Sequence, residues 1–299
     1  KKMSNDINFY NTASAEKLGW TPEWFGCEDF DEDLQQAIRE FQSRNGAKPD
    51  GMCGPNTYRR KYTERISSIE ETHVTPMGKD YILHCGNPIT IDWPRVVHWY
   101  DVNGLRANHF SVRYESQRPM RMFVNHWDVT LSSKHCQRIL DKRGISVHFL
   151  IDNDGTIYQT MDTRDVAWHA GSKRLNECSI GVEISNAYDP KYQQWYTRHG
   201  FGERPIIEDA YVHGRKLEPF MGFYPAQLQA LRALWSAIHK ATGIPLQTPE
   251  FQGQQSTTVE PNAANGTYSG FVSHYHLTER KIDCAGLNIV HQLQLLGDQ

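Results

Sequence analysis

One face of the segment at residues 225–242 is hydrophobic at helical spacing, through Leu228, Leu231, Trp235 and Ile238. A proline opens this segment and a glycine follows it, which is typical of the first turn and the end of a helix. The pattern predicts a long helix that packs onto a hydrophobic core through this face.

Strand-forming residues dominate four other segments, at residues 80–91, 120–129, 146–159 and 179–185. The third of these contains Asn-Asp-Gly and is expected to form two strands joined by a tight turn. A short helix is predicted from Ser133 to Leu140. Because strands and helices alternate, the predicted fold class is α/β, with a mixed central β-sheet flanked by helices.

The strand predicted at residues 179–185 places an acidic side chain opposite an apolar row. Ile180, Val182 and Ile184 share one face of this strand, whereas Glu183 lies on the other. A carboxylate that points away from an apolar row can face a cleft, so Glu183 is a candidate functional residue.

A separate helical pattern lies nearer the N-terminus, where Leu34, Ile38 and Phe41 follow two aspartates. Polar connecting sequence comes after it. We therefore predict the following organisation: a small all-helical module at 1–65, a linker at 66–78, and a catalytic domain at 79–299 with insertions near 187–224 and 246–270.

The composition argues against several classes of protein. The chain has 299 residues and a formal net charge of −3, so no overall positive field favours nucleic acid or anionic membrane as a partner. No apolar run reaches the roughly 18 residues that cross a bilayer, so we expect no membrane insertion. The start of the chain lacks the apolar region of a secretory signal. We expect a monomer that is synthesised in a host cytoplasm, with reduced cysteines.

Five residues from distant stretches of the chain suggest chemistry: His126, Glu183, His274, Lys281 and Asp283. Two imidazoles and one carboxylate are a ligand set of catalytic zinc that leaves a coordination position open for water. A separate glutamate and a lysine can then transfer protons and stabilise charge. This set predicts a metal-dependent hydrolase.

Several motifs in the same region are jointly specific: SVHFLIDNDG, AWHAG, NECSIGVE, and a Ser-His pair followed by Lys-Ile-Asp. Together they resemble the zinc-dependent type 2 N-acetylmuramoyl-L-alanine amidases, which include bacteriophage endolysins and are related to peptidoglycan-recognition proteins. The similarity extends over about residues 96–286. It implies an enzyme with one zinc ion per chain that cleaves the amide between N-acetylmuramic acid and the L-alanine of the stem peptide.

The resemblance assigns roles by position. It implies that His126 and His274 are zinc ligands and that Asp283 is the third, although the neighbouring Cys284 is a competitor because thiolates also bind zinc. Glu183 would take the proton of the attacking water and pass it to the departing amine. Lys281 would stabilise the oxyanion of the tetrahedral intermediate.

Two further residues are candidates for substrate binding. His169, in AWHAG, is expected to contact the substrate or to support the site. Tyr158 matches a tyrosine near the site in some relatives, and its alternative role is ordinary strand packing.

The N-terminal segment LQQAIREFQSRNGAKPDGMCGPNTYRRK resembles the small helical peptidoglycan-binding module. Such a module favours polymeric peptidoglycan, with its glycan strands and stem peptides, as the partner. The expected function is therefore cell-wall lysis in the manner of an endolysin, in the periplasm or outside the cell. Two alternatives are a muropeptide-recycling amidase that acts on soluble fragments and a non-catalytic peptidoglycan-binding protein.

Overall fold

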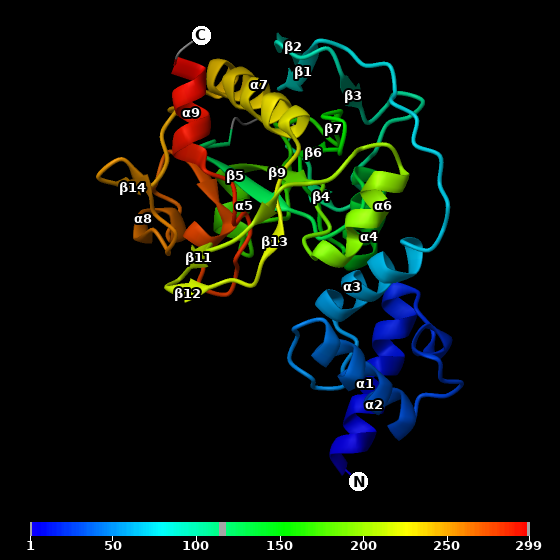
Figure 1. Cartoon of the computed structure of the whole chain (residues 1–299). Helices are drawn as coiled ribbons and strands as arrows, with labels where there is room; N and C mark the ends of the chain where they lie inside the picture. The colour runs from blue at the N-terminus through cyan, green and yellow to red at the C-terminus, as the bar shows by residue number, and fades with distance from the viewer. Residues whose placement is uncertain (1, 114–117, 298–299) are drawn as a thin grey trace. The chain divides into compact units, whose positions relative to one another are not determined.

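The computed structural model describes residues 2–113 and 118–297, and the chain divides into two compact units between Glu71 and Thr72 (Figure 1). Each unit has its own secondary structure and is considered by itself. Among the described residues, no helix combines the length and the apolar character needed to span a membrane.

The N-terminal unit is entirely helical in its described residues, as predicted. Its elements are α1 (Lys2–Leu18), the 3₁₀ helix η1 (Pro22–Phe25), α2 (Glu32–Arg44) and α3 (Pro55–Ile66). The backbone amide of Leu34 donates to Asp31 at 3.0 Å and so caps α2. Leu34, Ile38 and Phe41 are buried, which confirms the predicted stripe. The hydrophobic pattern of the sequence did not predict α1.

The second unit is built on a mixed sheet of six strands in the order β16-β5-β9-β6-β7-β3 within the described residues. These strands are β3 (Val96–His98), β5 (Met122–Trp127), β6 (Phe149–Ile151), β7 (Ile157–Gln159), β9 (Ser179–Ile184) and β16 (Gly270–Ser273). Neighbours are parallel except for β6 and β7, which are antiparallel and joined by the predicted turn. The α/β prediction with a mixed sheet is confirmed.

Helices and short hairpins surround this sheet. The helical elements are α4 (Ser133–Arg143), α5 (Lys173–Glu177), η2 (Pro190–Tyr192), α6 (Gln193–Arg198), α7 (Pro225–Thr242), α8 (Pro261–Ala264), η3 (His274–His276) and α9 (Ile289–Gly297). The paired short strands are β1 (Tyr81–His84) with β2 (Asn87–Thr90), β4 (Phe110–Ser111) with β8 (Val166–Ala167), β10 (Ile206–Ile207) with β13 (Phe220–Met221), β11 (Tyr211–Val212) with β12 (Arg215–Lys216), and β14 (Glu250–Phe251) with β15 (Gln254–Gln255). The two long polar stretches therefore contain short elements of their own.

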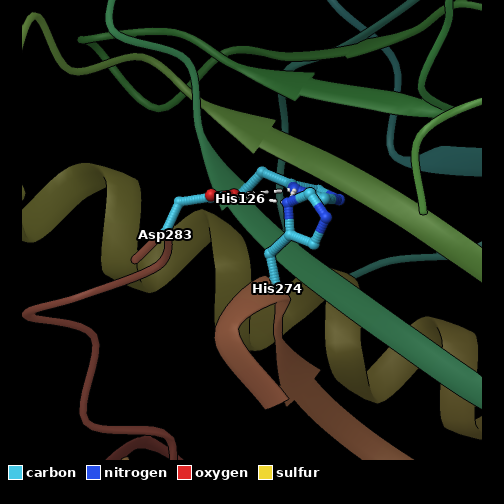
Figure 2. Close-up of side chains that lie close together, drawn as sticks. All are labelled: His126, His274 and Asp283. Atoms are coloured by element: carbon cyan, nitrogen blue, oxygen red, sulfur yellow. Dashed lines mark hydrogen bonds and ion pairs between the residues drawn. The ribbon is translucent and has the colours of Figure 1, made fainter. Parts of the chain in front are cut away.

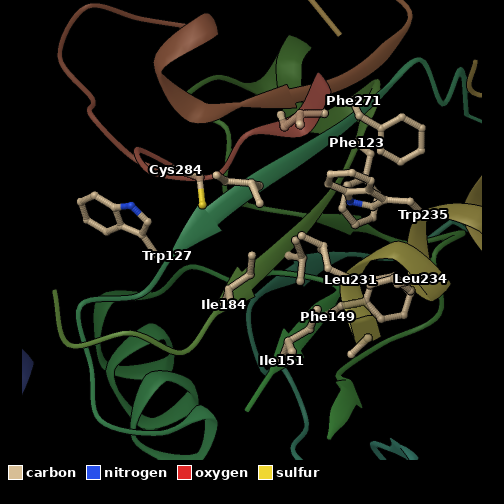
Figure 3. Close-up of a cluster of buried hydrophobic side chains, with 14 of the residues drawn as sticks. Phe123, Trp127, Phe149, Ile151, Ile184, Leu231, Leu234, Trp235, Phe271 and Cys284 are labelled. Carbon is tan, nitrogen blue, oxygen red and sulfur yellow. The ribbon is translucent and has the colours of Figure 1, made fainter. Parts of the chain in front are cut away.

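One face of the sheet packs against α7, the helix predicted from the hydrophobic pattern. Phe123, Phe271, Leu231 and Trp235 are fully buried in this core cluster, part of which Figure 3 shows. Burying each such side chain stabilises the fold by about 1.5–3 kcal/mol. The opposite face carries a smaller apolar cluster against α4 and also the polar residues described next.

Candidate functional site

Four side chains form a row across the face of the sheet opposite α7. His126 on β5 is the register partner of Glu183 on β9, Glu183 is the partner of Leu150 on β6, and Leu150 is the partner of Tyr158 on β7. Partners in register project from the same face. Because adjacent strands lie about 4.8 Å apart, His126 and Glu183 are neighbours, whereas Tyr158 lies roughly 14 Å from His126.

His126, His274 and Asp283 converge on one point near the C-terminal ends of β5 and β16 (Figure 2). The two Nδ1 atoms lie 3.0 Å apart. Oδ2 of Asp283 lies 2.9 Å from Nδ1 of His126 and 3.0 Å from Nδ1 of His274. The three residues are 2%, 6% and 9% exposed, so their donor atoms face one another away from bulk water.

The chemistry of this donor set fits zinc. A tetrahedral zinc ion with bonds of about 2.0–2.1 Å holds its ligand atoms about 3.3 Å apart. The three distances between the donor atoms are 2.9, 3.0 and 3.0 Å, so the atoms form a nearly equilateral triangle. Burial raises the pKa of Asp283, but the imidazoles of His274 and His126 outweigh burial and hold this pKa well below its ordinary value. The carboxylate is therefore ionised, as a metal ligand requires.

Cys284, the competitor of Asp283, lies elsewhere. Its side chain is fully buried in the hydrophobic cluster with Trp127 and Ile184 (Figure 3). Burial raises the pKa of this thiol well above its ordinary value, and the charges of Asp283 and Glu183 add to the effect. A protonated thiol within the core is a poor zinc ligand, so the geometry favours Asp283.

Residues of both long polar stretches form hydrogen bonds with the segment that carries His274, Lys281 and Asp283. His276 accepts a hydrogen bond from the backbone amide of Ser273 through Nδ1 and donates through Nε2 to the carbonyl of Ser256, at 2.7 Å. Burial lowers the pKa of His276 to about 4, so this imidazole is neutral. His276 therefore supports the turn at η3, a role that no pattern in the sequence predicted.

The other polar stretch, at residues 187–224, contacts the same segment at Lys281. Nε2 of His213, at the turn between β11 and β12, donates to the backbone carbonyl of Lys281 at 2.9 Å. The backbone of Lys281, two residues before Asp283, is thus held by a residue of this polar stretch.

His169 lies directly behind His126. Its Nδ1 is 3.1 Å from Nε2 of His126, and its Nε2 is 3.1 Å from Oγ of Ser179. Burial lowers the pKa of His169 well below its ordinary value, and the neighbouring imidazoles of His126 and His148 act in the same direction. Tyr158, by contrast, packs against the apolar cluster beside α4, and burial raises its pKa.

Two family models match different parts of this chain. The family model described as N-acetylmuramoyl-L-alanine amidase matches residues 116–284, and a model of a peptidoglycan binding domain matches residues 27–60. A Rickettsia conorii protein named as an N-acetylmuramoyl-L-alanine amidase is 30% identical over 93 residues, which are 29% of this chain and 34% of that protein. The match thus spans about a third of that relative's length.

Several solved structures are similar to this chain. The N-acetylmuramoyl-L-alanine amidase LysC from Clostridium intestinale is 17% identical, with a TM-score of 0.39, over 69% of this chain and 99% of that one. A selenomethionine derivative of AmpD is 19% identical, with a TM-score of 0.36, over 68% of this chain and 93% of that one. Because the amidase family model covers more than half of its length, this chain belongs to the N-acetylmuramoyl-L-alanine amidase family.

Proposed function

We propose that this protein hydrolyses the amide between N-acetylmuramic acid and L-alanine in peptidoglycan, with one zinc ion per chain. The observation that carries the proposal is the convergence of His126, His274 and Asp283 beside Glu183, within the segment that matches the amidase family. Two imidazoles and a carboxylate leave a fourth position for water or substrate, as in other catalytic zinc sites.

The residues around the ligands supply the remaining chemistry. Zinc, when bound, contributes Lewis acidity, which polarises the scissile carbonyl and lowers the pKa of water towards 7. Glu183 accepts the proton of the attacking water and returns it to the amine of the departing L-alanine. Lys281 stabilises the negative charge that develops on the carbonyl oxygen. Tyr158, farther along the same sheet face, is proposed to contact the substrate.

We propose a division of labour between the two parts of the chain. Residues 1–65 form the peptidoglycan-binding module, 66–78 the linker and 79–299 the catalytic domain, with insertions near 187–224 and 246–270. The match of residues 27–60 to a peptidoglycan binding domain supports the first assignment. A module that binds glycan strands and stem peptides raises the local concentration of the catalytic domain on an insoluble polymer. We propose further that the protein acts on the cell wall and that it acts as a monomer.

Digestion of purified sacculi by the intact chain in the presence of zinc tests the proposal. An amidase releases stem peptides with a new L-alanine amino terminus and creates no new reducing sugar. Amino-terminal labelling followed by mass spectrometry measures the first product, and a reducing-sugar assay measures the second. New reducing ends without free L-alanine amino termini would show that a glycosidic bond is cut instead.

The same assay separates the two alternatives. An enzyme that recycles muropeptides would cleave soluble fragments but leave sacculi intact. A non-catalytic binding protein would sediment with sacculi and cleave neither substrate. Cleavage of sacculi that is lost on zinc chelation and restored by added zinc is the result that we expect.

A further inference from the structure

A chain of hydrogen bonds leads from a backbone carbonyl to the proposed zinc ligand His126. The hydroxyl of Ser179 donates to the carbonyl of Leu175 at 2.6 Å. A hydroxyl has only one proton, so Oγ of Ser179 must accept in its contact with Nε2 of His169, 3.1 Å away. This contact places the proton of His169 on Nε2.

The proton on Nε2 of His169 determines the direction of the hydrogen bond between His169 and His126. In a neutral imidazole the other nitrogen is an acceptor, so Nδ1 of His169 presents a lone pair to Nε2 of His126, 3.1 Å away. His126 therefore carries its proton on Nε2 and presents a lone pair from Nδ1. That lone pair points to the place where Nδ1 of His274 and Oδ2 of Asp283 lie 3.0 and 2.9 Å away.

Neighbouring residues hold the ring of His169 in this position. The side-chain oxygen of Asn176 accepts from the backbone amides of His169 and Ala170, at 3.1 and 2.7 Å. The ring also packs against Gly181, where a Cβ atom would lie only 2.6 Å from Nδ1. The glycine therefore makes room for the imidazole directly behind His126.

These contacts decide between the two roles that the sequence left open for His169. Both ring nitrogens are already bonded within the protein, one to Ser179 and one to His126. No polar atom of the ring is left for a substrate.

We propose that His169 is a positioning residue, which uses its Nε2–H tautomer to orient His126 and to direct the Nδ1 lone pair of His126 at the metal. This inference rests on the proposed zinc site. Hydrogen-bond partners behind a metal-bound histidine fix its tautomer and typically contribute 10–100-fold to metal affinity.

Nuclear magnetic resonance of the intact, ¹⁵N-labelled chain with zinc tests the tautomers directly. We expect protons on Nε2 of both His126 and His169, and none on Nδ1 of either ring. A proton on Nδ1 of His169 would overturn the proposal, because that nitrogen could then no longer accept from His126. This measurement uses the unmodified protein and does not depend on whether a variant folds.

Zinc affinity, measured by competition with a chromophoric chelator, tests the energetic consequence. We expect His169→Phe to raise the zinc dissociation constant about 10–100-fold. His169→Asn keeps an acceptor near the position of Nδ1 and should recover much of the loss, which a merely structural role would not predict. His239→Phe is the matched control, because His239 forms its hydrogen bond with the backbone carbonyl of Ile244, just after α7, and not with the site. Thermal unfolding of each metal-free variant establishes that it is folded.

The same titration distinguishes failure of this inference from failure of the proposed function. If the unmodified chain does not bind zinc, or if His126→Ala binds zinc as tightly as the unmodified chain, the zinc site itself is wrong. If His126→Ala loses zinc but His169→Phe binds it with unchanged affinity, the site stands and the positioning role of His169 is refuted.

Discussion

His126 and Glu183 are register partners on the adjacent parallel strands β5 and β9, so their side chains leave the same face of the sheet one strand apart. The backbone hydrogen bonds between β5 and β9 thus fix the spacing between His126, a proposed metal ligand, and Glu183, the proposed proton-transferring carboxylate. Groups on packed strands keep their separation better than groups on loops. The pairing gives Glu183 a role distinct from that of the ligands, and the roles can be tested separately.

Substitution of Glu183 by glutamine should abolish proton transfer without removing the metal. Glutamine has nearly the same shape but cannot accept a proton at neutral pH, so we expect turnover on sacculi to fall about 10²–10⁴-fold. Zinc affinity should change little. Glu177→Gln is the control, because Glu177 pairs with Arg113 rather than with the site. Loss of zinc from Glu183→Gln would instead identify Glu183 as a ligand.

Asp283 and Cys284 are adjacent in sequence but should differ completely in their effect on zinc. Asp283→Ala removes a proposed ligand, and we expect the zinc dissociation constant to rise more than about 100-fold. This is more than the 10–100-fold expected when a residue that only hydrogen-bonds a ligand is replaced. Cys284→Ala removes a buried thiol and should lower the free energy of unfolding by about 1 kcal/mol. Its zinc content, measured by atomic emission after dialysis, should stay near one per chain. The reverse pattern would make Cys284 the ligand.

Local patterns in the sequence predicted most of the fold. The helix at 225–242 has the predicted bounds, and the alternation in SIGVEI correctly placed Glu183 opposite the apolar row. Hydrophobic spacing did not predict α1. Few residues of this helix are buried, so its sequence carries only a weak apolar face. The pattern also failed at α9, which lies among the last residues of the chain.

The hydrogen bonds that support the site residues could not be predicted from the sequence. His213, His276 and Ser179 each act through a hydrogen bond to a residue that is ten or more positions away in the sequence. No periodicity marks such a contact, because it depends on how loops pack rather than on local conformation. Likewise, only the path of the backbone after η3 shows that Asp283 faces the two histidines and that Cys284 faces the hydrophobic cluster.

His73 and Asp154 should make the stability of the second unit depend on pH. Nε2 of His73 lies 3.0 Å from Oδ2 of Asp154, and this hydrogen bond raises the pKa of His73 above its ordinary 6.5, although burial opposes the shift. The stabilisation that protonated His73 gains from Asp154 is therefore fully present below pH 6.5. It is lost as pH rises through the raised pKa that His73 has in the folded protein. Burial raises the pKa of Asp154, but hydrogen bonds from His73 and Thr156 outweigh it, so Asp154 stays ionised throughout this range.

Chemical denaturation of the His73→Gln variant at several pH values between 5 and 8 measures this effect. We expect the variant to be less stable than the unmodified chain by up to about 1 kcal/mol at the acid end, with a difference that shrinks towards pH 8. Thr75 donates to the same carboxylate oxygen but does not titrate. Thr75→Ala should therefore lower stability by an amount that does not vary with pH. A constant difference for His73→Gln would show that His73 does not titrate through this contact.

Gly181 should be intolerant of even one methyl group, for a steric reason that involves His169. An alanine Cβ at this position would lie 2.6 to 2.9 Å from three atoms of the imidazole. We expect Gly181→Ala to cost about 1–3 kcal/mol of stability and to weaken zinc binding, because the displaced ring no longer supports His126. In the double variant with His169→Ala the clash is absent, so the stability penalty of Gly181→Ala should largely vanish while zinc binding stays weak. A double-mutant cycle of unfolding free energies and zinc dissociation constants measures both effects. If the two substitutions were additive in stability, the penalty at Gly181 would have to come from some contact other than the ring of His169.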